Sequence, residues 1–172
     1  ASGVFVTSED GNLYCLDRRS GTLRWKYPLG ARSVAAPLLL DGLVYAAGFD
    51  SCFSAIDSKT GTFLWRIDLG EPVEWTQPKA VGSLVYGAGR GGSVFCIDPA
   101  SRSVRWKRKV GREFRGQISA SERLICAADE QGIYALDPMT GQEKWQRDVG
   151  GEGPTEAHGR VYCFASGRDL LV

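Results

Sequence analysis

The stretch AIDSKTGTFLW, from Ala55 to Trp65, decides the fold because the chain contains three relatives of it. The relatives end at Trp25, Trp106 and Trp145, so the spacing between successive tryptophans is 40, 41 and 39 residues. A repeat period near 40 residues is typical of propellers and solenoids. The chain is therefore a repeat protein, and the repeat has to be interpreted before any single residue.

Each repeat predicts a group of short β-strands. Two apolar runs, such as VYAAG from Val44 and FSAID from Phe53, flank a polar turn, and the tryptophan stretch follows. Such runs, rich in Val, Ile, Tyr and Phe and bounded by Gly, Asp and Asn, are typical of strands. A variable segment completes the unit and counts as a fourth strand. The pattern predicts an all-β propeller of four-stranded antiparallel blades, with about four blades in this chain.

The strands differ in how they should be buried. The second run is apolar on both faces, which fits a strand packed between two neighbouring blades. The tryptophan strand instead alternates, with Trp25 facing one way and Arg24 and Lys26 the other. Charged residues suit an outer edge, because they discourage pairing with another sheet.

The turn before each tryptophan predicts how blades are joined. An aspartate can accept hydrogen bonds from turn amides, and a glycine four residues later supplies a positive φ and an open peptide surface. A tryptophan of an adjacent blade can lie over that surface. Arg102 replaces the glycine in the third copy, so that junction should be the loosest or its turn rebuilt. The predicted docking residues are Trp25, Trp65, Trp106, Trp145, Gly21, Gly61, Gly141, Asp17, Asp57, Asp98 and Asp137.

These motifs are similar to the PQQ-like, tryptophan-docking β-propeller repeat of quinoprotein dehydrogenases and of the outer-membrane assembly lipoprotein propeller. The resemblance covers residues 1–172, with repeats near 4–42, 43–83, 84–122 and 123–159 and a partial fifth at 160–172. It implies a larger ring of seven or eight blades, of which this chain is a fragment, or half of a ring completed by a second chain. A closed four-bladed ring is the alternative.

The resemblance says less about function, because the family ranges from redox enzymes to scaffolds and sensors. We expect a non-catalytic binding, scaffold or sensor module that presents blade-top loops to a protein or small ligand. It would need no cofactor. The alternative is a fragment of a PQQ-dependent dehydrogenase, which would bind PQQ with Ca²⁺. Family members of that kind stack PQQ between a tryptophan and a disulfide of adjacent cysteines, and no two cysteines are adjacent here.

Departures from the repeat concentrate in the variable segments 31–40, 71–80, 112–120 and 151–157. These segments should form the innermost strands and the loops at one mouth of the propeller. An aromatic ring among charged side chains can hold a flat or charged ligand. The alternative is a solvated mouth without a ligand. The candidate ligand or partner residues are Trp75, Glu74, Glu71, Gln77, Arg112, Phe114, Arg115, Arg32 and Glu156.

Charge and hydropathy limit the partners. The 21 basic and 20 acidic residues nearly cancel, which argues against nucleic acid, and no apolar stretch approaches the roughly 18 residues of a membrane span. A protein partner, the remaining blades or a second copy of the chain is expected instead. One local excess of charge stands out in the third repeat, with only Glu113 opposing it. It could dock an acidic partner or form a solvated rim, and it comprises Arg102, Arg105, Lys107, Arg108, Lys109, Arg112 and Arg115.

The five cysteines have no metal-binding spacing and replace small core residues of other repeats. We expect them to act as small hydrophobic residues. Free thiols favour a reducing compartment such as the cytoplasm, whereas the family resemblance favours the periplasm or cell envelope. The sequence leaves the localisation open between these two.

Overall fold

The computed structural model describes residues 3–73, 76–157, 160–165 and 168–171, and its regular secondary structure over these residues is β-strand. The chain divides into two compact units, Ala1–Glu74 and Trp75–Val172. Every strand pairing within the sheets is antiparallel. The predicted all-β fold is confirmed.

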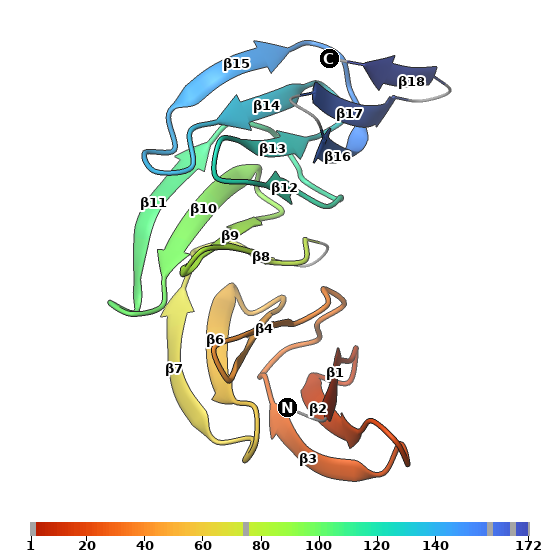
Figure 1. Cartoon of the computed structure of the whole chain (residues 1–172), viewed down its shortest axis with the longest axis vertical. Coiled ribbons are helices and arrows are strands. Elements are labelled where there is room, and N and C mark those ends of the chain that lie inside the picture. Colours follow the sequence, from red (N-terminus) through yellow and green to blue (C-terminus); the bar gives the residue numbers. More distant parts are fainter. Residues whose placement is uncertain (1–2, 74–75, 158–159, 166–167, 172) are drawn as a thin grey trace. The chain divides into compact units, whose positions relative to one another are not determined.

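The first unit holds a three-stranded sheet, β1-β2-β3, and a four-stranded sheet, β4-β5-β6-β7 (Figure 1). The strands are β1 (Gly3–Thr7), β2 (Asn12–Asp17), β3 (Leu23–Pro28), β4 (Leu38–Leu40), β5 (Leu43–Ala47), β6 (Cys52–Asp57) and β7 (Phe63–Asp68).

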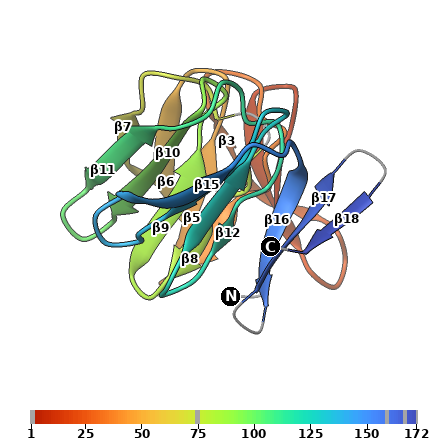
Figure 2. The same cartoon turned by 90° about the horizontal axis from the view of Figure 1, so that it is seen from above.

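The second unit holds two four-stranded sheets, β8-β9-β10-β11 and β12-β13-β14-β15, and a three-stranded sheet, β16-β17-β18 (Figure 2). Its strands are β8 (Lys79–Val81), β9 (Leu84–Ala88), β10 (Ser93–Asp98), β11 (Ser103–Lys109), β12 (Ser119–Ala120), β13 (Ile125–Ala128), β14 (Ile133–Leu136), β15 (Glu143–Arg147), β16 (Glu152–Ala157), β17 (Arg160–Ala165) and β18 (Arg168–Leu171).

The four-stranded sheets are the predicted blades, and each begins at the end of a variable segment. β4, β8 and β12 come from these segments and pair with the first apolar run of the following repeat. Each blade then ends with its tryptophan strand, β7, β11 or β15. The loops that follow β3 and β11 each lead from one sheet to the next within a unit, and their backbone amides and carbonyls bond to the turns of both sheets.

Burial follows the predicted pattern of inner and outer strands. Residues of β6, β10 and β14 are buried on both faces, with only the final aspartate of β6 and β10 half-buried. The tryptophan strands expose most of their other residues. β2 differs, because Tyr14 and Leu16 are half-buried while Val4 and Val6 of the neighbouring β1 are 44% and 43% exposed. No described sheet of the first unit covers that face.

Tryptophan docking occurs within each unit. In the first, a Cβ built on Gly61 would lie 2.7 Å from Cδ2 of Trp25, and the indole Nε1 donates to the Ser58 carbonyl at 3.2 Å. In the second, Trp106 contacts Gly141 in the same way and donates to the Pro138 carbonyl at 2.9 Å.

The remaining docking residues have other surroundings. Gly21 has the expected positive φ, but nothing in the described structure lies within 4 Å of a Cβ built there. Trp65 packs against Tyr45 and Phe53 of its own sheet. Trp145 is half-buried and packs near Val161 and Cys163.

The aspartate turns form as predicted. Oδ1 of Asp57 accepts hydrogen bonds from the amides of Lys59 and Thr60 at 2.9 and 2.8 Å, and Asp17, Asp98 and Asp137 do the same in their own turns. Arg102 adopts φ 54°, close to the glycines at this position. The turn is therefore kept rather than rebuilt, with a side chain in a left-handed conformation that favours glycine.

All five cysteines are buried as thiols. Cys15 and Cys96 sit opposite Trp25 and Trp106 on the neighbouring strand, as Ala55 and Ala135 sit opposite Trp65 and Trp145. This equivalence supports their predicted role as small core residues.

Candidate functional site

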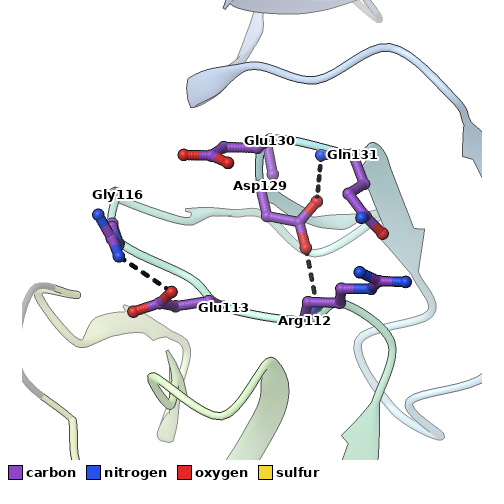
Figure 3. Close-up of a pocket in the computed structure, with 8 residues that line it drawn as sticks. Arg112, Glu113, Gly116, Asp129, Glu130 and Gln131 are labelled. Carbon is purple, nitrogen blue, oxygen red and sulfur yellow. Dashed lines mark hydrogen bonds and ion pairs between the residues drawn. The ribbon is translucent and has the colours of Figure 1, made fainter.

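A pocket of about 190 Å³ lies in the second unit, between the loop that follows β11 and the β13–β14 turn (Figure 3). The turn connects the buried strands β13 and β14, and the loop joins β11 to β12, so the ends of both segments are held by the sheets. The pocket is lined by Arg112, Glu113, Arg115, Gly116, Ala128, Asp129, Glu130 and Gln131.

Asp129 holds the two segments together. It is 5% exposed, and its Oδ2 accepts a hydrogen bond from the Arg112 amide at 2.8 Å. Its Oδ1 accepts from the amides of Gln131 and Gly132 at 2.9 and 3.0 Å and from the Tyr134 hydroxyl at 3.3 Å. A buried carboxylate is costly unless such donors satisfy it. Here they connect the loop to the turn (Figure 3).

The same contacts set the charge of Asp129. Burial acts to raise its pKa, but the three amides and the hydroxyl outweigh burial, so the pKa lies below its ordinary value. Asp129 is therefore an ionised anchor at neutral pH.

Close packing beside Asp129 requires a glycine at position 111. A Cβ built on Gly111 would lie 2.7 Å from both Asp129 Oδ2 and Phe114 Cζ. A larger residue would push the carboxylate away from the Arg112 amide or displace the Phe114 ring.

Ion pairs order the outer part of the loop. Glu113 accepts from Arg90 Nε at 3.0 Å and from an Arg115 guanidinium nitrogen at 3.1 Å. These two guanidinium groups, with Arg115 the larger cause, lower the pKa of Glu113, and Glu113 raises that of Arg115. The pocket thus presents cations and carboxylates side by side, with Arg112, Arg115, Glu130 and Gln131 exposed.

The sequence matches a known protein family over most of its length. The family model described as outer membrane protein assembly factor BamB matches residues 1–72 and again residues 54–167. The chain belongs to the BamB family.

Individual relatives of this BamB-family chain have different names. It is 29% identical over 127 residues to serine/threonine-protein kinase AfsK of Streptomyces griseus, covering 67% of the chain and 15% of the relative. It is 29% identical over 123 residues to polyvinylalcohol dehydrogenase of Sphingopyxis sp. (strain 113P3), covering 60% of the chain and 18% of the relative. The chain thus spans less than a fifth of each relative.

A solved structure gives the same fold. The crystal structure of BamB from Moraxella catarrhalis matches with a TM-score of 0.85 at 20% identity, covering 100% of this chain and 58% of that one. At this identity the likeness shows the fold alone.

The structure brings together only part of the predicted surface. Arg112 and Arg115 line the pocket of this BamB-family chain. Gln77 lies in the same unit, where its amide donates to Gln117 Oε1 at 3.2 Å and its side chain accepts from Lys79. Glu156 accepts a hydrogen bond from the Ser121 hydroxyl and is half-buried.

Phe114 was predicted to lie on the binding surface, but the structure buries it. Its ring is 2% exposed and packs edge-on against Tyr134 at 5.9 Å, so it belongs to the core below the pocket. Phe114 stands three residues after Gly111. Ser33 and Val73 stand three residues after the equivalent glycines of their own repeats and are buried too. This position of the repeat therefore faces the core, and Phe114 follows the same pattern.

Other candidates lie elsewhere. Arg32 and Glu71 belong to the first unit, where the Arg32 guanidinium lies 3.9 Å from the centre of the Phe49 ring and Glu71 is half-buried. Glu74 and Trp75 fall outside the described residues. The structure therefore does not test Trp75 as a stacking residue.

Three pocket residues were not predicted from the sequence, namely Asp129, Glu130 and Gln131. One signal was available, because Asp129 occupies the repeat position filled by Ser8, Gly48 and Gly89. A carboxylate in place of glycine at a tight turn departs from the repeat as clearly as the variable loops do.

Two carboxylates of the pocket are held by donors of the chain itself and are not available to bind Ca²⁺. The Asp129 carboxylate is occupied by three amides and a hydroxyl, and Glu113 is bound to two guanidinium groups. Within the described part of the chain, no cluster of three or more His, Cys, Asp or Glu side chains could hold a metal ion.

None of the described segments forms a helix that is long and apolar enough to cross a membrane.

Proposed function

We propose that this chain is a non-catalytic β-propeller module that binds a protein partner through the pocket surface. That surface comprises Arg112, Glu113, Arg115, Glu130 and Gln131. The observation that carries the proposal is the Asp129 anchor, which fixes the loop to the β13–β14 turn before any partner arrives. A surface fixed in advance loses less conformational entropy on binding.

The charges of the pocket support a protein partner. Exposed Arg112 and Arg115 lie beside Glu113 and Glu130, so both signs of charge are displayed over a small area. Such a pattern selects a partner with complementary charges and fixes its register. The name of the BamB family supports a role in outer membrane protein assembly and a place in the cell envelope.

A dehydrogenase is the second candidate, favoured by the likeness to polyvinylalcohol dehydrogenase. Titration of the chain with PQQ and Ca²⁺ separates the two functions. A dehydrogenase fragment would give a new visible chromophore and quenched tryptophan emission. The binding module proposed here gives neither change.

Site-specific photo-crosslinking in the source cells tests the binding surface. We expect a photoreactive residue at Gln131 to capture a defined protein, whereas the same residue at exposed Lys59 in a docking turn captures none. The captured protein is then purified and its affinity measured. R115E should weaken binding roughly tenfold or more, because a central charged contact is reversed, while K59E leaves binding unchanged.

Two results would overturn this proposal. One is equal capture from Gln131 and Lys59, which would show that no specific surface lies at the pocket. The other is an affinity for the purified partner that R115E and K59E change equally.

A further inference from the structure

Strand β11 carries an excess of positive charge. Arg105, Arg108 and Lys109 are exposed along the strand, Lys107 is half-buried, and exposed Arg102 precedes them in the turn. Within the described part of the chain, no ion pair engages Arg102, Arg105, Arg108 or Lys109. These five residues are called the β11 basic edge below.

The carboxylates that flank this segment in sequence are already engaged. Asp98 accepts hydrogen bonds from the amides of Ala100 and Ser101 at 2.9 and 3.4 Å. Glu113 is bound to Arg90 and Arg115. Arg102, Arg105, Arg108 and Lys109, which are exposed, therefore keep their charge toward solvent.

Two of the other tryptophan strands pair a cation with the aspartate of their own turn. On β3, Arg24 forms an ion pair with Asp17 of its own turn, and on β15, Lys144 pairs with Asp137 at 3.2 Å. Arg105 stands at the same repeat position as Arg24 and Lys144 but has no such pair.

The excess also exceeds what edge protection requires. The position of Lys109 is filled by Pro28, Asp68 and Asp148 in the other repeats, so two of them place an acid where β11 has a cation. Charged side chains at an edge discourage edge-to-edge pairing, and this purpose does not require the cation at Lys109.

β11 is also a free edge. It is the last strand of the sheet β8-β9-β10-β11 and pairs only with β10 among the described residues (Figure 1). Alternate residues of a strand face opposite sides. Lys107 and Lys109 therefore flank the edge on one face, and Arg108 flanks it on the face that carries Trp106.

We propose that the β11 basic edge binds an acidic, extended polypeptide segment as an additional strand of the sheet. Unpaired backbone groups of β11 would supply the hydrogen bonds, and cations on both faces would pair with carboxylates at successive positions of the segment. This surface is separate from the pocket and does not depend on the function proposed for it.

The arrangement favours a peptide over a nucleic acid. Its cations follow a single extended strand with a free backbone edge, which matches the spacing of an added β-strand. The chain as a whole carries a formal net charge of only +1, so it lacks the general attraction that nonspecific polyanion binding uses.

Fluorescence anisotropy with designed peptides tests the proposal. The probe is a labelled peptide of about six residues, the usual length of a strand, with the sequence Thr-Glu-Glu-Thr-Glu-Glu, which places Glu on both faces of the strand and is called the Thr–Glu peptide. Its first control has Gln in place of Glu. Its second control keeps Glu but carries N-methyl groups on alternate amides, which removes donors needed for strand pairing.

We expect the Thr–Glu peptide to bind and both control peptides to bind at least tenfold more weakly. The variant R105E/K109E should weaken Thr–Glu binding roughly tenfold, because each opposed charge pair contributes a fraction of a kcal/mol and reversal adds repulsion. The matched variant R18E/R19E changes net charge equally at an exposed turn and should leave binding unchanged. Circular dichroism confirms that both variants fold.

Several outcomes would contradict this inference. Equal binding of the N-methylated peptide would mean that charge alone acts and that no strand is added. Tighter binding of a DNA oligonucleotide than of the Thr–Glu peptide would make the edge a polyanion site. An equal loss of binding in R105E/K109E and R18E/R19E would remove any role for β11.

Discussion

The indole of Trp106 lies directly over Gly141, so that a Cβ built on the glycine would come within 2.6 Å of the ring. The glycine has a φ of 69°, and the indole nitrogen donates to the Pro138 carbonyl of the same turn. One residue therefore meets two demands, a left-handed backbone and an uncovered peptide surface. Gly21 meets only the first in the described structure, since its φ is 70° and nothing lies within 4 Å of a Cβ built there.

This pair of glycines separates backbone strain from docking. Gly21→Ala should cost about 1 kcal/mol from the left-handed φ, and Gly141→Ala about 3 kcal/mol because the ring must also move. Urea unfolding of the two variants and the wild type measures the difference. Equal destabilisation would show that the indole does not depend on the bare peptide surface.

The third docking turn offers the reverse experiment. Arg102 holds a φ of 54° where the other three repeats have glycine. Arg102→Gly should stabilise the chain by roughly 0.5–1 kcal/mol, because relief of the left-handed strain exceeds the added freedom of the unfolded chain.

Arg102→Ala is the control, because it removes the side chain and keeps the strain. Its urea midpoint should stay at or below that of the wild type. A glycine variant no more stable than the alanine variant would mean that the turn tolerates arginine without cost.

Repetition explains which features could be predicted. Asp57, Gly61 and Trp65 belong to a motif whose turn is local and whose four copies share one register, so its geometry follows from neighbouring residues. The Asp129 anchor is different, because its carboxylate reaches an amide 17 residues away in a loop without a repeated sequence. Phe114 was misplaced for a related reason, because its ring packs against Tyr134 of a different strand.

The Asp129 anchor should be sensitive to its own charge. Asp129→Asn places an amide group among amide donors and should cost about 2–3 kcal/mol at pH 7, the range for hydrogen bonds to a charged group with a buried partner left unpaired. Asp129→Gly restores the residue found at Gly48 and Gly89 and should cost less. Urea unfolding checks the order, and an asparagine variant as stable as the wild type would remove the anchor's electrostatic role.

At acid pH the wild type and Asp129→Asn should differ less in their free energy of unfolding than at pH 7. The pKa of Asp129 is lower in the folded chain than its ordinary value, so its contribution is complete at neutral pH and is lost as pH falls through the folded pKa. Asp17, Asp57 and Asp137 also have lowered pKa values and are common to both proteins. The urea midpoints of the wild type and of Asp129→Asn are therefore compared at pH 7 and at pH 3, and the change in their difference reports on Asp129 alone. A difference that is the same at both pH values would contradict this assignment.

The buried thiols should be inert in the folded chain. Burial, the largest cause, raises the pKa of Cys96 to about 11 and that of Cys126 to about 12. The thiolate is the reactive species, so both the low thiolate fraction and the lack of access slow any reaction at pH 8. We expect a disulfide reagent such as DTNB to label the native protein only as fast as it unfolds, and to label all five cysteines at once in concentrated urea. Rapid labelling of one full equivalent in the native state would show that a cysteine is reactive and not a small core residue.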